Sequence, residues 1–169
     1  STAARQTRLR AGVEERGPKR SFELKLEWKV SPKGNSGIMY LVVEDEQYSS
    51  PYLTGPEYQL IDDEGYPAEL EPGQTTGANY ALNPPTVDAT KPAGEWNTAR
   101  IKLDNGQVEH WLNGQLVAQY EIWTPEWEAA VAQTKFKDIP SYGQAREGHL
   151  ALQDHSDPVS FRNIKVRTW

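Results

Sequence analysis

Polar side chains alternate with leucines in the segment HLALQDH at 149–155. In a strand with Leu150 and Leu152 on one face, Gln153 and His155 lie on the other, and the small Ala151 leaves room above the sheet. A histidine can exchange a proton near neutral pH, and an amide can hydrogen-bond a hydroxyl group. This face is therefore a candidate floor for a ligand site.

A second segment, EYQLID at 57–62, has the same alternation and puts Glu57 and Gln59 opposite its two apolar residues. In SFELKLEWKV at 21–30, the same alternation puts Glu27 and Lys29 opposite the apolar residues of the strand. If these faces converge with Gln153 and His155, they form a hydrogen-bonding surface for a polyhydroxylated ligand. The alternative is that all of these side chains simply face water, as one face of an antiparallel sheet can.

Two further polar residues allow more than one interpretation. His110 has the same strand parity as Val108 and Leu112, which favours a buried, hydrogen-bonded structural histidine over a ligand-binding one. Arg162 in SFRNIKV either pairs with a carboxylate or anchors the last strand. The sequence leaves both choices open.

Alternating apolar residues predict antiparallel strands along most of the chain after Ser21. Asp104-Asn105-Gly106 and Asn113-Gly114 are typical of tight hairpin turns, in which Asn and Gly tolerate positive φ. Thr124 as a cap and Pro125 in the first turn predict one short helix at about 125–137. The predicted strands cover 21–30, 38–44, 57–62, 98–104, 107–113, 115–123, 149–155 and 159–169.

These elements predict an all-β fold, an antiparallel two-sheet sandwich of the jelly-roll type or a related one, with one short helix. Residues 63–97 are rich in Pro and Gly and predict long loops, which often carry function. The 169 residues suit a single domain, and we place it at 21–169. Residues 1–20 carry a net charge of +4 and few apolar groups, so we interpret them as a flexible basic tail.

Composition excludes several classes of protein. The net charge of −6 argues against a nucleic-acid-binding face, and no apolar run of the length of a membrane span occurs. The chain has no cysteine, so disulfides and thiol catalysis are excluded. The start at Ser1, without an apolar leader, is what we expect of a processed form.

Known catalytic motifs are also missing. The sequence contains no P-loop, no GxGxxG after a strand, no HExxH and no GxSxG. Retaining glycosidases with this kind of sandwich carry two carboxylates on alternate strand positions, about 5 Å apart. In Glu57-Tyr58-Gln59 an amide stands where the second carboxylate would be, which disfavours a double-displacement glycosidase.

Seven segments follow one another along the chain: FELKLEWK, GNSGIMY, GPEYQLID, KPAGEWN, VEHWLNG, GHLALQDH and VSFRNIKV. Together they resemble the 3-keto-disaccharide hydrolase family, from about Phe22 to Trp169. The resemblance implies a concanavalin-A-like jelly roll that is exported by bacteria, to the periplasm or the medium, and acts on glycosides with a ketone at C3. Members of that family carry a further amino-terminal segment, which the basic tail replaces here, so a partner chain could complete the sheet.

A ketone at C3 acidifies the proton on C2, and loss of that proton sets up elimination of the C1 substituent, after which water can add. Such a site needs a base, an acid and an electrophile for the enolate oxygen. We expect His155 and Glu57 to be the two proton carriers, and Gln59, Gln153 and Lys29 to hold sugar hydroxyls or the enolate oxygen. Arg162 is a further candidate for that oxygen, and a divalent metal held by His155 and Glu57 is an alternative electrophile.

Two other functions are compatible with the same residues. A non-catalytic carbohydrate-binding module could use the same fold and the same hydrogen-bonding face. An interaction domain could instead recruit a partner through the basic residues 1–20.

Overall fold

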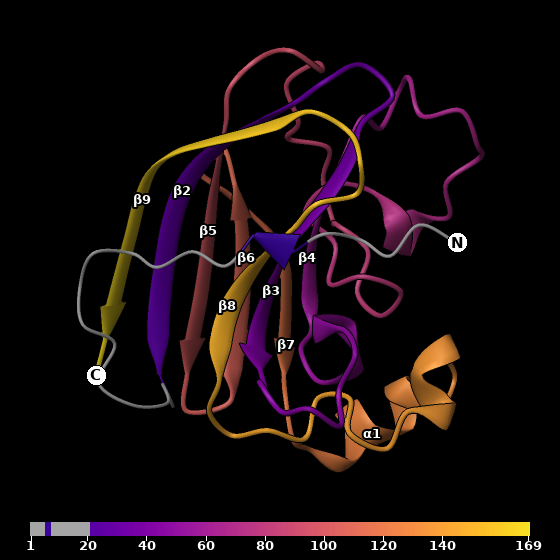
Figure 1. The fold of residues 1–169 in the computed structure, drawn as a ribbon, viewed down its shortest axis with the longest axis vertical. Helices are drawn as coiled ribbons and strands as arrows, with labels where there is room; N and C mark the ends of the chain where they lie inside the picture. The colour runs from indigo at the N-terminus through magenta and orange to yellow at the C-terminus, as the bar shows by residue number, and fades with distance from the viewer. Residues whose placement is uncertain (1–5, 8–20) are drawn as a thin grey trace.

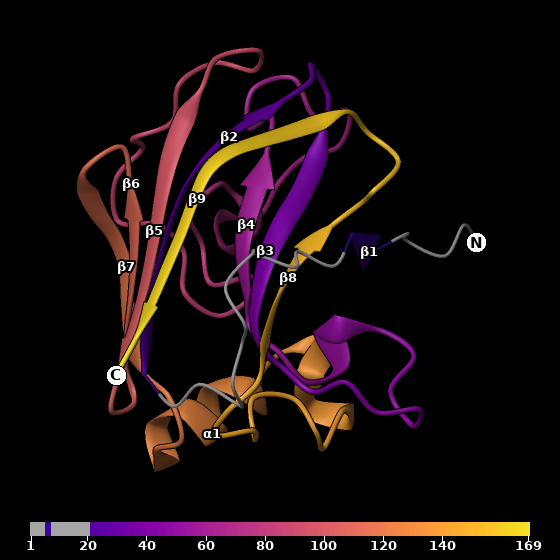
Figure 2. The same cartoon turned by 60° about the vertical axis from the view of Figure 1, so that its left-hand side comes forward.

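The computed structural model describes residues 6–7 and 21–169, and in it two antiparallel sheets pack face to face (Figures 1 and 2). Sheet A has the strand order β1-β8-β3-β4, and sheet B has the order β7-β6-β5-β2-β9. The predicted all-β antiparallel sandwich with one short helix is confirmed. The strands are β1 (Gln6–Thr7), β2 (Phe22–Val30), β3 (Asn35–Val42), β4 (Glu57–Ile61), β5 (Asn97–Asp104), β6 (Gln107–Leu112), β7 (Gln115–Glu121), β8 (His149–Gln153) and β9 (Val159–Thr168).

Alternation in the sequence decides which side chains enter the space between the sheets. In β2 every second residue is at most 2% exposed, and the residues between them are more exposed. In β4, Tyr58 and Leu60 are fully buried against sheet B, as their spacing predicts. Glu57 therefore points to the opposite face of sheet A.

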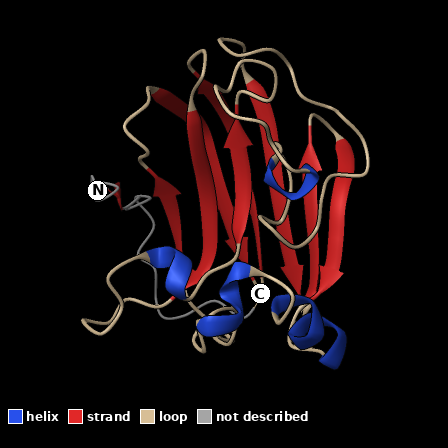
Figure 3. Cartoon of the chain, turned by 90° about the vertical axis from the view of Figure 1, so that its right-hand side faces the viewer, coloured by secondary structure: helices blue, strands red, loops and turns tan. Residues whose placement is uncertain are grey.

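The helical elements lie together at one end of the sandwich, apart from one short turn beside the sheets (Figure 3). The predicted helix at 125–137 is divided in two, because α1 (Pro125–Val131) ends before the 3₁₀ turn η3 (Lys135–Asp138). Thr124 caps α1, with its Oγ1 accepting a hydrogen bond from the Trp127 backbone amide at 3.2 Å. Two further 3₁₀ turns are η1 (Pro51–Leu53) and η2 (Pro72–Gln74).

The segment at 77–80 runs along the outer edge of β4, although the sequence predicted only loop there. The backbone amide of Gln59 donates to Ala78, and that of Tyr80 donates to Glu57. These bonds cover the edge of sheet A and bring Tyr80 next to Glu57. The covered edge explains why a stretch so rich in Pro and Gly is ordered.

At the amino terminus, Gln6–Thr7 pair with β8 at the other edge of sheet A. The rest of the segment 1–20 lies outside the described residues, so its interpretation as a flexible tail stays a prediction. Within residues 6–7 and 21–169, no helix is long and apolar enough to cross a membrane.

Candidate functional site

A hollow of about 200 Å³ opens on the outer face of sheet A, away from the core. Its polar lining includes Glu57 and Gln59 from β4, Gln153 from the end of β8, and His155 just beyond that end. These are the four residues that alternation placed on two separate strands. The structure brings them together because β3 lies between β4 and β8 in sheet A. The remaining lining residues are Asn35, Tyr52, Tyr80, Lys135 and Phe136.

Glu57 has an unusual environment for a carboxyl group. Burial raises its pKa to about 8, and the opposing effect of the nearby Lys135 ammonium does not cancel this. The carboxyl group is therefore mostly protonated at neutral pH. In this state it can donate a proton or a hydrogen bond to a ligand in the hollow.

The carboxyl group of Glu57 lies directly over Gly37 of β3, which pairs with Gln59 across the strands. A Cβ atom at position 37 would collide with the Glu57 Oε1 atom. The absence of a side chain at Gly37 therefore provides the space that the carboxyl group occupies.

We expect Gly37→Ala to lower any activity that needs Glu57 by about 10-fold to 100-fold, because the added methyl group displaces the carboxyl group. The free energy of unfolding should change by less than about 1 kcal/mol, since the colliding group is the mobile end of a side chain. Activity assays and thermal melts of both proteins measure this. Gly73→Ala is the control, because a Cβ there makes ordinary contacts at 3.4 Å. Full activity in Gly37→Ala would contradict the expectation.

Gln59 is 2% exposed, yet one of its polar atoms has no partner. Its Nε2 donates to the backbone carbonyl of Gln74 at 3.0 Å, which fixes the orientation of the amide, while its Oε1 accepts nothing. The Oδ1 atom of Asn35 is also buried and unpartnered, and Asn35 lines the same hollow. Both amide groups belong to residues that line the hollow, and each keeps an acceptor that no other described residue satisfies.

His155 stands at the open side of the hollow, with 46% of its side chain exposed. Its Nδ1 lies 3.8 Å from the Oδ2 of Asp157. The same Oδ2 accepts a hydrogen bond from the backbone amide of Asn35 at 3.2 Å, which ties this loop to the start of β3. Asp157 is therefore an anchored carboxylate within ion-pair distance of the imidazole ring.

Three of the predicted ligand-binding residues do not reach the hollow. Glu27, Lys29 and Arg162 lie on sheet B, on the face directed away from the core, so their predicted convergence with Glu57 is wrong. Arg162 donates to the Oε1 of Glu27 at 3.2 Å and stacks over the ring of Trp96 at 3.9 Å. Lys29 lies 4.9 Å from the centre of that ring. The physical reason is that strand alternation defines two faces per sheet but not which sheet a strand joins.

His110 is completely buried between the sheets, which agrees with the structural interpretation and not with a ligand-binding one. Its Nδ1 donates to the carbonyl of Gly77 at 2.9 Å, so its Nε2 accepts from the hydroxyl of Tyr40 at 2.8 Å. The hydroxyl of Tyr120 completes the chain by donating to Tyr40. Burial lowers the pKa of His110 to about 4, so the ring is neutral.

Several lining residues were not predicted. Asn35, which lines the hollow, and Gly37, which lies under Glu57, both precede the predicted strand at 38–44, because the Gly-rich segment before Ile38 hides the true start of β3. Extending the alternation back from Met39 would have put both on the face of Glu57. No alternation pattern in the sequence could point to Lys135 or Tyr80, since neither lies in one of the strands.

The hollow contains ligand types that a divalent cation accepts, namely Glu57, His155 and the free amide oxygens of Gln59 and Asn35. In the described part of the chain, no three His, Cys, Asp or Glu side chains cluster as a metal site would require. A metal at His155 and Glu57 stays a prediction.

The sequence profile of the 3-keto-alpha-glucoside-1,2-lyase-like domain family matches residues 13–167. The chain belongs to this family. The resemblance seen in the seven ordered segments is thereby confirmed. A curated relative from Bacteroides thetaiotaomicron, named 3-keto-disaccharide hydrolase, is 35% identical over 88% of this chain. The chain spans 58% of the length of that relative.

Solved structures agree with the family assignment. A crystal structure from Parabacteroides distasonis, of a protein provisionally classed as a glycosyl hydrolase, is 38% identical with a TM-score of 0.87. It covers 91% of this chain, and this chain covers 74% of it. The carbohydrate-binding module CBM66 from Bacillus subtilis is 10% identical with a TM-score of 0.52, and the two chains cover 90% and 78% of each other. This second likeness shows only that the two proteins have the same sandwich fold.

Proposed function

We propose that this member of the 3-keto-alpha-glucoside-1,2-lyase-like domain family is a carbohydrate-processing enzyme that cleaves 3-keto-glycosides. The observation that carries the proposal is the hollow on sheet A, where an imidazole and a carboxyl group that is protonated at neutral pH face the same space. The names of the relatives from Bacteroides and Parabacteroides support the same class of reaction. Export to the periplasm or medium is part of the proposal.

The reaction begins at C2 of the sugar. A base removes the C2 proton, and the electron pair of the C–H bond moves into the C3 ketone to form an enolate. When that pair returns, the bond between C1 and the glycosidic oxygen breaks, and the oxygen takes a proton as it leaves. Water then adds at C1 of the unsaturated ketone and a proton returns to C2, which gives net hydrolysis without an oxocarbenium ion.

The environments of the two proton carriers favour one assignment of roles. Glu57 holds its proton up to about pH 8, so it can protonate the departing oxygen. His155 is exposed at the mouth of the hollow, where its imidazole can take the C2 proton. Two groups with different environments thus divide the acid and base work.

The polar lining can hold the sugar while the protons move. The amide groups of Gln59, Asn35 and Gln153 line the hollow, and amides are suited to hydrogen-bond sugar hydroxyl groups. The hollow of about 200 Å³ is smaller than the pockets that take drug-sized ligands, so it suits one sugar ring with the remaining substituent outside.

The test compares a 3-keto-glucoside with the matched unoxidised glucoside that carries the same chromogenic aglycone. We expect aglycone release from the ketone only, because without the carbonyl group the C2 proton is not acidic. Equal release from both glucosides would contradict the proposed mechanism. Binding of the keto-glucoside, measured by calorimetry, without any release would favour a non-catalytic carbohydrate-binding module.

A further inference from the structure

Lys135 lies at the rim of the hollow on η3, outside the strands that supply the proton carriers. Its Nζ donates a hydrogen bond to the hydroxyl of Tyr80 at 3.3 Å and lies 4.4 Å from the centre of the Tyr80 ring. Tyr80 is in turn fixed beside Glu57, through the backbone bond between these two residues. The ammonium group is therefore held against the same wall of the hollow as Glu57.

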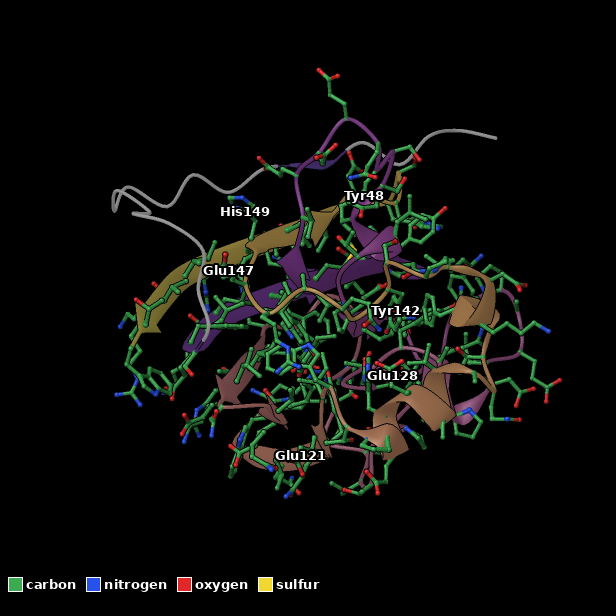
Figure 4. All side chains as sticks on the ribbon, turned by 90° about the horizontal axis from the view of Figure 1, so that it is seen from below. Tyr48, Glu121, Glu128, Tyr142, Glu147 and His149 are labelled. Atoms are coloured by element: carbon green, nitrogen blue, oxygen red, sulfur yellow. The ribbon has the colours of Figure 1, made fainter. Side chains whose placement is uncertain are left out.

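The turn that carries Lys135 is anchored in the core by its neighbour Phe136, which is 4% exposed. The ring of Phe136 stacks on that of Tyr142, with the ring centres 3.9 Å apart. Figure 4 shows Tyr142 inside the fold. In the same view, Glu121 and His149 mark the two opposite sides of the sandwich. The Oγ1 of Thr134 also accepts a hydrogen bond from the backbone amide of Phe136 at 3.2 Å. The base of the Lys135 side chain thus has a fixed position relative to the hollow.

The hollow holds a lysine beside a carboxyl group that carries little negative charge at neutral pH. Of the described residues that line it, Lys135 is the single lysine or arginine, and it forms no ion pair with Glu57. Because burial keeps Glu57 mostly protonated at neutral pH, the carboxyl group does not neutralise the ammonium group. The hollow therefore presents an uncompensated positive charge to its ligand, and such a charge stabilises an anion that forms during a reaction.

We infer that Lys135 is a catalytic residue that binds the C3 oxygen of the substrate and stabilises the enolate formed there. The inference rests on the proposed function. As the C2–H electron pair moves toward C3, negative charge grows on the oxygen, and the ammonium group donates a hydrogen bond to it while keeping its proton. When the pair returns and the C1–O bond breaks, the charge leaves this oxygen again.

The experiment follows the exchange of the C2 proton of a 3-keto-glucoside in D₂O by NMR, which reports enolate formation separately from aglycone release. We expect Lys135→Ala to slow both exchange and kcat by about 100-fold, the usual cost of losing one oxyanion donor. Lys135→Arg should recover part of the rate because it restores the charge. Lys137→Ala is the matched control, since Lys137 lies on the same exposed turn but does not line the hollow.

The outcomes separate the two proposals. If the unaltered protein neither exchanges the C2 proton nor releases aglycone, the proposed function is overturned and the role of Lys135 with it. If the unaltered protein exchanges the proton and Lys135→Ala does so equally fast, the role of Lys135 alone is overturned. A variant with normal exchange and a raised KM would show that Lys135 only binds the sugar, and this result also overturns enolate stabilisation.

Discussion

His155→Ala should reduce kcat on a 3-keto-glucoside by about 1000-fold while the protein keeps its fold. The imidazole is the group with the right chemistry to take the C2 proton at neutral pH, and loss of such a base costs two to four orders of magnitude. The side chain is 46% exposed, so the free energy of unfolding should change by less than about 0.5 kcal/mol. Steady-state kinetics and thermal melts measure the two quantities.

His149→Ala is the matched control for this experiment. His149 lies on the same strand and the same face as Gln153, but it lines a different depression beside Val43 and Tyr48 and not the hollow. We expect this variant to keep its activity. Exchange of the C2 proton should be lost in His155→Ala and retained in His149→Ala. Normal exchange in His155→Ala would show that His155 is not the base that removes the C2 proton.

Glu57→Gln should also reduce kcat by about 1000-fold, because an amide cannot protonate the departing glycosidic oxygen. In the unaltered protein, activity should fall as the pH rises past about 8, where Glu57 loses its proton. The residual activity of Glu57→Gln should lack this fall. A glycoside with a highly acidic aglycone, which leaves without a proton, should recover most of the lost rate. Equal loss for all leaving groups would contradict the role of Glu57 as the acid.

The same substitution should stabilise the protein in alkaline solution. The folded protein holds the Glu57 proton up to about pH 8, whereas the unfolded chain loses it near 4.5, so stability falls as the pH rises between these values. Glutamine is neutral at every pH and removes this loss. We expect Glu57→Gln to be more stable than the unaltered protein by up to about 5 kcal/mol at pH 9, and equally stable at pH 4.

Denaturant titrations at the two pH values measure this difference, with Glu69→Gln as the control at an exposed carboxylate. A variant with Glu57→Gln that is less stable at pH 9 would show that the carboxylate is well stabilised in the folded state. That result would contradict the protonated form on which the acid role depends. The stability measurement thus tests the protonation state independently of any substrate.

The sequence determined the fold class and the core-facing residues, because both follow from local alternation. Tyr58 and Leu60 had to share a buried face, and this alone put Glu57 and Gln59 on the opposite one. The turn signals at Asn105-Gly106 and Asn113-Gly114 were also sufficient, since both pairs have positive φ and join neighbouring strands of sheet B.

Only the tertiary structure decided which outward faces meet. Glu27 and Lys29 obey the same alternation as Glu57 but lie on the other sheet, because the order of strands in a sheet depends on contacts between distant segments. Lys135 reaches the hollow because Phe136 stacks on Tyr142, a contact that leaves no periodic trace in the chain. Periodicity fixes the face of each side chain, whereas long-range packing fixes its neighbours, and chemistry at a site needs both.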